Sequence, residues 1–319
     1  MRRAAFRLAA LVLLLASAGC GAGPPKPARE SAAPPPTAAP SAEETARLFR
    51  VREAVKPLHE SLRPPRPGDW LSMNEEPGQT LEEYLAGQPT TADGARRTLY
   101  VQPLGEFTEG QRRLVELVAD YMGRFYGLPV RVNAALPLSL VPHTERRLQW
   151  GVEQIRTGYV LTDILRPRLP EDAAALIAFT ASDLYPDETM NFVFGQASLS
   201  ERVGVWSVAR FGDPEASVEE FRVCLRRTMK LATHETGHMF SIRHCALYEC
   251  NMNGSNHMEE TDRHPVDYCP ECVAKLFRAT RADPRARYSR LEEFCHSQGL
   301  TAERAFFAMA ALRVAEQGL

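Results

Sequence analysis

Residues 231–272 read LATHETGHMFSIRHCALYECNMNGSNHMEETDRHPVDYCPEC, and the rest of the chain is arranged around this stretch. It holds five of the eight histidines and four of the seven cysteines of the chain. Imidazole nitrogens and thiolate sulfurs are ligands that zinc prefers in proteins. The stretch therefore predicts a metal-binding region.

The first motif in the stretch, His234-Glu235-Thr236-Gly237-His238, is an H-E-x-x-H. On a helix its two histidines lie about 40° apart around the axis and about 6 Å apart along it, so both can bind one zinc ion. Glu235 is rotated by about 100° from His234 and can reach a zinc-bound water rather than the ion. The motif predicts two metal ligands and a general base.

His244 is the expected third ligand of the same zinc. A helix continued to this residue would carry it about 240° past His238, so the helix has to end between the two. Glycine is best suited to the left-handed turn that brings the third histidine back. Ser241 stands at this point, and serine adopts such a turn at a cost of roughly 1 to 2 kcal/mol.

Four cysteines follow, Cys245, Cys250, Cys269 and Cys272. Four thiolates suit a closed tetrahedral zinc site, and the spacing of Cys269 and Cys272 is that of a zinc knuckle. Two disulfides are the alternative, because residues 1–19 have the pattern of an export signal, described below, and disulfides are favoured outside the cytosol. The knuckle spacing and the place of Cys245 directly after His244 favour zinc.

The complete pattern, H-E-x-x-H-x-x-S-x-x-H-C followed by C-x-M and C-x-x-C, resembles that of the archaemetzincins, a branch of the metzincin zinc peptidases. The similarity extends over roughly residues 98–277, and Ser241 is the one clear departure, because the family has glycine there. The resemblance implies that the chain hydrolyses peptide bonds through a zinc-bound water activated by Glu235. Cleavage within a chain and aminopeptidase cleavage both stay open.

The resemblance also implies the role of each site residue and a content of two zinc ions per chain. Met252 is expected beneath the catalytic site, as the methionine of the Met-turn. The implied ligands are His234, His238 and His244 for the catalytic zinc, and Cys245, Cys250, Cys269 and Cys272 for a structural zinc. The implied partner is a peptide or protein substrate.

Residues 1–19 have the pattern of an export signal, in which arginines precede an apolar run too short to cross a membrane. Cys20 fits a bacterial lipoprotein site, whereas the Ala-Ser-Ala of residues 16–18 fits ordinary signal-peptidase cleavage. We favour the lipoprotein, because the Pro/Ala-rich residues 20–44 suit a disordered tether. We therefore expect an exported protein in the cell envelope, in the periplasm or at the outer membrane, with this lipid as its only membrane anchor.

The folded part is predicted to be α/β, with three segments. Residues 45–97 form a helix and loops that cover the catalytic domain, residues 98–280 form that archaemetzincin-like domain, and residues 281–319 form helices packed on it. The catalytic domain is expected to hold a metzincin-like mixed, mostly parallel sheet beside the zinc-bearing helix. Nothing in residues 45–97 suggests chemistry.

Apolar spacing predicts the elements of the catalytic domain. A strand, a helix at 108–127 and a strand follow one another over residues 98–135 and predict a parallel pair with a crossover helix. The apolar run 174–180 predicts a central strand that is buried on both faces. Residues 146–165 predict a further helix, and by the resemblance residues 191–197 form an antiparallel edge strand that pairs with substrate.

Polar and thiol side chains outside the motifs are expected to be structural. Ser217 and Glu220 form a Ser-x-x-Glu capping box that begins the zinc-bearing helix. Cys224 is expected to be a small core residue. His257 and His264 lie in a polar loop and are expected to be solvated.

Composition and motifs also weigh against other classes of function. A formal net charge of −2 gives no general attraction to nucleic acid, and a nucleic-acid-binding zinc ribbon would need a basic patch that the chain lacks. The main alternative is a zinc-organised binding or scaffold domain with weak or lost peptidase activity, which Ser241 favours. Glu235 argues against it, because a structural zinc site has no use for a general base.

Overall fold

The structure, a computed structural model, describes residues 39–319 except residue 93 and residues 199–200. The predicted export signal, the lipid site at Cys20 and most of the predicted tether lie outside the described residues. Within the described ranges, none of the helices combines the length and the hydrophobicity needed to cross a lipid bilayer.

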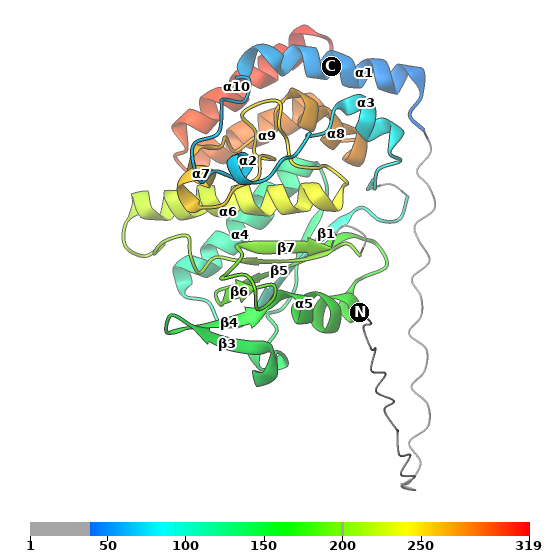
Figure 1. The fold of residues 1–319 in the computed structure, drawn as a ribbon. Helices are drawn as coiled ribbons and strands as arrows, with labels where there is room; N and C mark the ends of the chain where they lie inside the picture. The colour runs from blue at the N-terminus through cyan, green and yellow to red at the C-terminus, as the bar shows by residue number, and fades with distance from the viewer. Residues whose placement is uncertain (1–38, 93, 199–200) are drawn as a thin grey trace, which may run out of the picture. The chain divides into compact units, whose positions relative to one another are not determined.

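The main sheet consists of β1 Thr98–Leu104, β2 Val130–Val132, β5 Ala173–Thr180, β7 Gly195–Ser198 and β8 Val203–Ser207. The strand order is β2-β1-β5-β8-β7 (Figure 1). The first four strands in this order run parallel, and β7 lies antiparallel to β8 at one edge. The predicted mixed, mostly parallel sheet is thus confirmed.

The helices differ widely in length. The longer ones are α1 Ala42–Val55, α4 Glu109–Tyr126, α6 Val218–Met239, α8 Pro270–Thr280, α9 Pro284–Ser297 and α10 Thr301–Glu316. The short ones are α2 Trp70–Met73, α3 Leu81–Ala86, α5 Thr157–Tyr159 and α7 Met258–Arg263.

The predicted crossover helix is α4, which joins the parallel pair of β1 and β2. Thr108 and Gln111 form a capping box at its start, and Gly127 ends it with a left-handed φ of 64°. The predicted bounds 108–127 therefore correspond to the two caps of the helix.

The side chains of the central strand β5 alternate between two apolar cores, as the pleat of a strand requires. Ile177 and Phe179 face the core shared with α4 and α6, whereas Leu176 and Ala178 face the core shared with residues 160–165. Every residue of β5 is buried. The prediction of a central strand covered on both faces is confirmed.

The helix predicted at residues 146–165 is wrong over its first half. This segment forms β3 Arg146–Gln149 and β4 Val152–Arg156, which join β6 Asp183–Tyr185 in a second sheet, and it becomes helical only from Thr157. Trp150 and Gly151 have φ values of 51° and 78°. Two successive residues with positive φ make a tight hairpin turn that a helix cannot contain, so the apolar spacing was misread.

The predicted edge strand 191–197 is shifted toward the C-terminus, to Gly195–Ser198. The preceding residues join the two sheets instead. The amide of Val193 donates to the carbonyl of Leu184 in β6, and the amide of Ser207 in β8 donates to the carbonyl of Phe194. Only from Gly195 onward does the segment pair regularly with β8.

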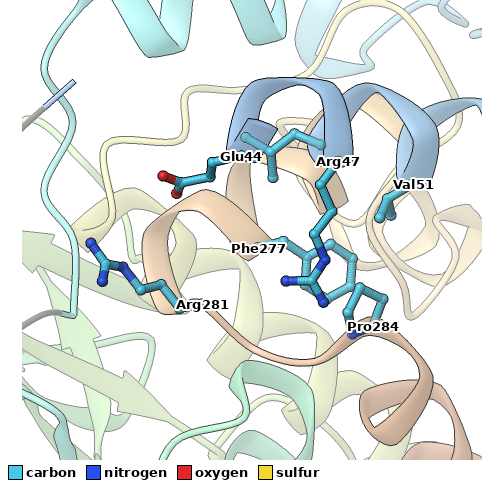
Figure 2. A pocket seen from close by; sticks show the side chains of 7 residues that line it. Glu44, Arg47, Val51, Phe277, Arg281 and Pro284 are labelled. Carbon is cyan, nitrogen blue, oxygen red and sulfur yellow. The ribbon is translucent and has the colours of Figure 1, made fainter. Parts of the chain in front are cut away.

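Helix α1 lies against α8 and α10 at the end of the molecule away from the second sheet (Figure 1). Glu44 in α1 forms an ion pair of 3.2 Å with the buried guanidinium of Arg278 in α8. Beside this pair, Arg47 and Phe277 line a small pocket between α1 and α8 (Figure 2). The first helix of the described residues, α1, thus packs against two helices near the C-terminus.

Candidate metal centre

Three histidine side chains converge at the C-terminal end of α6. Their ligand nitrogens lie within 4.8 Å of one another, and Nε2 of His234 lies 3.0 Å from Nε2 of His238. These two residues are one turn apart, so the helix presents both rings on the same face. The ring of His244 joins them from the following loop, with its centroid 5.2 Å from that of His234.

The turn after α6 brings His244 back to the helix. Ser241 has a left-handed φ of 64°. The amide of Ile242 donates to the carbonyl of Gly237 at 3.1 Å, and the amide of Ser241 donates to that of His238 at 2.9 Å. These two bonds form the Schellman motif that ends many helices. The helix therefore ends between His238 and His244 as predicted, with serine in the left-handed position.

The second nitrogen of each α6 histidine lies against a backbone carbonyl. Nδ1 of His234 is 2.7 Å from the carbonyl oxygen of Asn251, and Nδ1 of His238 is 2.7 Å from that of Ile242. Because a carbonyl only accepts, each Nδ1 carries the ring proton. Each Nε2 then keeps its lone pair for another partner.

Nδ1 of the third histidine, His244, faces a carboxylate. It lies 2.9 Å from one oxygen of Glu76 and 3.1 Å from the other. The carboxylate accepts from Nδ1, as in the carboxylate–histidine–zinc arrangements of metal sites. In all three rings Nδ1 therefore faces an oxygen atom.

The electrostatics of the three rings fit a bound cation. Burial lowers the pKa of His238 to about 4 and holds that of His234 well below its usual range, so both rings are neutral near pH 7. Neutral rings whose lone pairs face each other at 3.0 Å repel unless a cation lies between them. Three convergent imidazoles whose second nitrogens are anchored are a zinc donor set that leaves a coordination position open.

Sequence reasoning missed Glu76 and Trp70. Both lie in the segment in which no chemistry was expected, and this expectation is wrong. The ring of Trp70 packs edge-on against His244 with centroids 5.3 Å apart. Its amide donates to both carboxylate oxygens of the buried Glu260, which places α2 beside α7 (Figure 1). No local pattern marks a contact between residues 168 positions apart, as Glu76 and His244 are.

Glu235 follows His234 on α6 and lines the same cleft. Burial raises the pKa of its carboxyl group to about 7. A group with this pKa both takes up and releases a proton readily at neutral pH, which general acid–base chemistry requires.

Met252 lies directly beneath the H-E-x-x-H turn of α6. A Cβ atom added to Gly237 would come within 2.7 Å of its Sδ atom and within 2.3 Å of the hydroxyl oxygen of Tyr268. Both side chains are fully buried. Glycine is needed at this position because these two side chains fill the space that any larger residue would occupy.

The four cysteines Cys245, Cys250, Cys269 and Cys272 form a buried cluster behind the histidines, with sulfur atoms within 4.8 Å of one another. All four are free, and Sγ of Cys245 lies 3.6 Å from Sγ of Cys269. The amides of Met252 and Cys269 donate to Sγ of Cys250. Burial raises the pKa of Cys250 and Cys269, so a bound cation is needed to keep several thiolates together.

The histidines open into a cleft with a volume of about 530 Å³ between residues 189–195 on one side and α6 with residues 251–264 on the other. The expectation of solvation fits His257, whose side chain is 42% exposed, but is wrong for His264. Nδ1 of His257 accepts from the amide of Glu260 and caps α7. His264 is partly buried in the cleft, with Nδ1 3.2 Å from the hydroxyl oxygen of Ser255.

Comparison with known proteins places the chain in a family. Residues 170–278 match the family model of Peptidase family M54. The chain is 33% identical over 297 residues to Archaemetzincin-2 of Rattus norvegicus, which covers 79% of this chain and 81% of the rat protein. It is 32% identical over 193 residues to Archaemetzincin of Thermococcus kodakarensis, which covers 57% of this chain and 96% of that protein. The crystal structure of archaemetzincin from Methanopyrus kandleri aligns with 59% of this chain and 97% of its own, with 28% identity and a TM-score of 0.47. The chain belongs to the archaemetzincin family of zinc metallopeptidases.

Proposed function

We propose that the chain hydrolyses peptide bonds in the cleft, with Glu235 as its general base. The observation that carries the proposal is the convergence of three histidines that each have Nδ1 against an oxygen atom. A purely structural site would have no use for the carboxyl group of Glu235, whose pKa lies near 7 beside them.

His234, His238 and His244 would hold the catalytic zinc. When bound, zinc supplies a Lewis acid that polarises the scissile carbonyl and lowers the pKa of water. Glu235 takes a proton from the attacking water and then delivers it to the nitrogen of the leaving amine. Glu76 and the carbonyls of Asn251 and Ile242 keep the three rings oriented during these steps.

A second zinc on the four cysteines is part of the proposal. Cys245 follows His244 directly, and its amide donates to the carbonyl of Met252 at 2.7 Å. A metal on Cys245 would therefore fix the loop that carries the third catalytic ligand, as well as the segment beneath α6. Its role is to hold the catalytic site in shape rather than to react.

The activity test exposes the zinc-loaded full chain to a diverse peptide pool and reads the cut positions. We expect cleavage that a chelator abolishes and added zinc restores, and the positions of the cuts distinguish endopeptidase from aminopeptidase action. Glu235→Gln should bind as much zinc as the parent but cleave nothing, because only the base is lost. Cleavage at equal rates by this variant and its parent would refute the assigned role of Glu235.

We further propose that the protein is an envelope lipoprotein anchored through Cys20. The arginines and the apolar run that precede this cysteine support the proposal, as does the proline-rich segment that follows it. Cys20→Ser should move the protein from the membrane fraction into the soluble fraction. A parent protein that is already soluble, with an unmodified N-terminus, would favour ordinary signal-peptidase cleavage.

A further inference from the structure

The cleft continues past the histidines along α6, toward the N-terminal end of that helix, and its two sides differ in chemistry. Phe192, Phe194 and Phe211 line one side. The floor on the other side is polar and is made by Lys230, Ser255 and His264. A substrate group that fits both sides has an apolar stem and a polar end.

Lys230 lies one helical turn before His234, on the same face of α6 and about 6 Å away along the axis. It lines the cleft although it is only 6% exposed. Its ammonium donates to the carbonyls of Thr261 and Asp262 at 3.0 and 3.1 Å. These bonds hold Nζ at the floor and use two of the three ammonium protons. The third proton remains for a ligand.

The charge of Lys230 is not neutralised by a salt bridge with any described residue. The carboxylate of Asp262 pairs with Arg227 at 2.6 Å. That of the buried Glu260 accepts from the backbone amides of Trp70 and Asn256. Burial lowers the pKa of Lys230 to about 8, so the ammonium is mostly charged at pH 7. The floor therefore holds a buried cation that two carbonyl groups and the more distant charges of Asp262 and Glu303 favour, and that an incoming anion would stabilise further.

His264 and Ser255 add neutral hydrogen-bonding groups beside this cation. Nδ1 of His264 lies 3.2 Å from the hydroxyl oxygen of Ser255. Burial, with Lys230 nearby, lowers the pKa of His264 to about 4, so its ring is neutral at pH 7. The bond between these two groups uses one of their two protons, so one proton, on Nε2 of His264 or on the hydroxyl group of Ser255, remains to donate to an oxygen atom.

We propose that Lys230, His264 and Ser255 form a recognition site for a carboxylate of the substrate. The carboxylate belongs either to an Asp or Glu side chain next to the scissile bond or to the free C-terminus of a short peptide. The apolar wall accommodates the methylene groups that precede it. This inference rests on the proposed peptidase function, because it names the substrate class of the same cleft.

The test measures peptide binding separately from hydrolysis. Zinc-loaded Glu235→Gln is titrated with fluorescent peptides of one sequence, with Glu or the isosteric Gln at each position in turn and with a free or amidated C-terminus. One charge-assisted hydrogen bond should give about tenfold tighter binding or more. A preference for Glu over Gln identifies a side-chain carboxylate, and a preference for the free terminus identifies the terminal one.

Adding Lys230→Gln should abolish this preference. The matched control is Lys275→Gln, since Lys275 is also buried and donates to a backbone carbonyl, that of Gln79, but does not line the cleft. It should leave the preference intact. The inference is overturned if each carboxylate peptide binds no more tightly than its amide counterpart, a result that requires no Lys230 variant. It is also overturned if the preference for the carboxylate survives Lys230→Gln. Absence of hydrolysis by the parent protein would overturn the peptidase function alone and leave the binding result standing.

Discussion

The carboxylate of Glu76 lies 2.9 Å from Nδ1 of His244, which joins the segment before α3 to the third histidine of the metal centre. Removing this oxygen partner frees the ring to rotate and to move its proton to Nε2. We expect Glu76→Ala to weaken zinc binding about 10- to 100-fold, as is usual for loss of such partners. Competition with a chelating dye measures the change.

Glu75→Ala is the control for Glu76. Glu75 is exposed and lies next to Glu76, so its replacement changes the local charge equally without touching the ring of His244. Its zinc affinity should stay close to that of the parent. If both variants bind zinc equally well, the Glu76–His244 contact has no part in holding the metal.

The left-handed Ser241 makes two opposing contributions to stability. Glycine would relieve roughly 1 to 2 kcal/mol of backbone strain. It would also remove the hydroxyl group that accepts from the amide of Thr90 at 3.1 Å, a bond that contributes about 1 kcal/mol. We therefore expect Ser241→Gly to change the free energy of unfolding by less than about 1 kcal/mol, whereas the β-branched Ser241→Val should lower both stability and zinc affinity. If chemical denaturation gives Ser241→Val the same free energy of unfolding as the parent, the left-handed turn does not contribute to stability.

Sequence reasoning predicted the features that depend on local spacing. The H-E-x-x-H helix, the helix end before His244 and the buried strand 174–180 all follow from residues a few positions apart, and the structure has them. The hairpin at Trp150 was missed because a tryptophan with positive φ gives no turn signal in the sequence. The same limit explains why the segment 146–165 was read as helix.

Contacts over long sequence separations were beyond prediction. His264 was expected to be solvated because the surrounding sequence is polar, yet Glu260 in the neighbouring helix α7 accepts from the amide of Trp70, 190 residues away. The same segment places His264 in the cleft, where it is partly buried. Composition describes a segment but does not say what covers it.

Gly237→Ala should destabilise the packing of α6 against Tyr268 and Met252 at the metal centre. The new methyl group would meet the Tyr268 hydroxyl oxygen at 2.3 Å and Met252 Sδ at 2.7 Å, far closer than van der Waals contact. Overpacking of this kind costs about 1 to 3 kcal/mol, which thermal unfolding should show as a lower Tm. The matched control is Thr236→Ala, because the buried Thr236 hydroxyl has no hydrogen-bond partner among the described residues. A Tm that falls equally in both variants would refute the packing argument.

His264 should make stability depend on pH. Its pKa is lowered from 6.5 to about 4, first by burial and then by Lys230. Below pH 6.5 this histidine binds a proton in the unfolded chain, whereas in the folded chain it stays neutral until about pH 4. The contribution of His264 to the free energy of unfolding is therefore fully present above pH 6.5 and is lost as the pH falls from 6.5 to 4. His264→Gln should remove on the order of 2 kcal/mol of this loss. Denaturation of zinc-free protein between pH 4 and 7 isolates the effect, and identical slopes for variant and parent would exclude it.

The four-cysteine cluster should hold zinc as thiolates even if the protein is exported, as proposed. All four sulfurs lie within 4.8 Å of one another, so each could bind a common cation, whereas a disulfide joins only two at about 2 Å. We expect two zinc ions per chain by metal analysis of the denatured protein.

Cys250→Ser should lose one of these zinc ions and bind the other more weakly, because Cys245 links the cluster to the loop of His244. Cys224→Ser, at a buried free cysteine outside the cluster, should keep both. After chelation, thiol titration should find the four cysteines of the cluster reduced. A result of one zinc per chain with no free thiols at these positions would instead establish two disulfides.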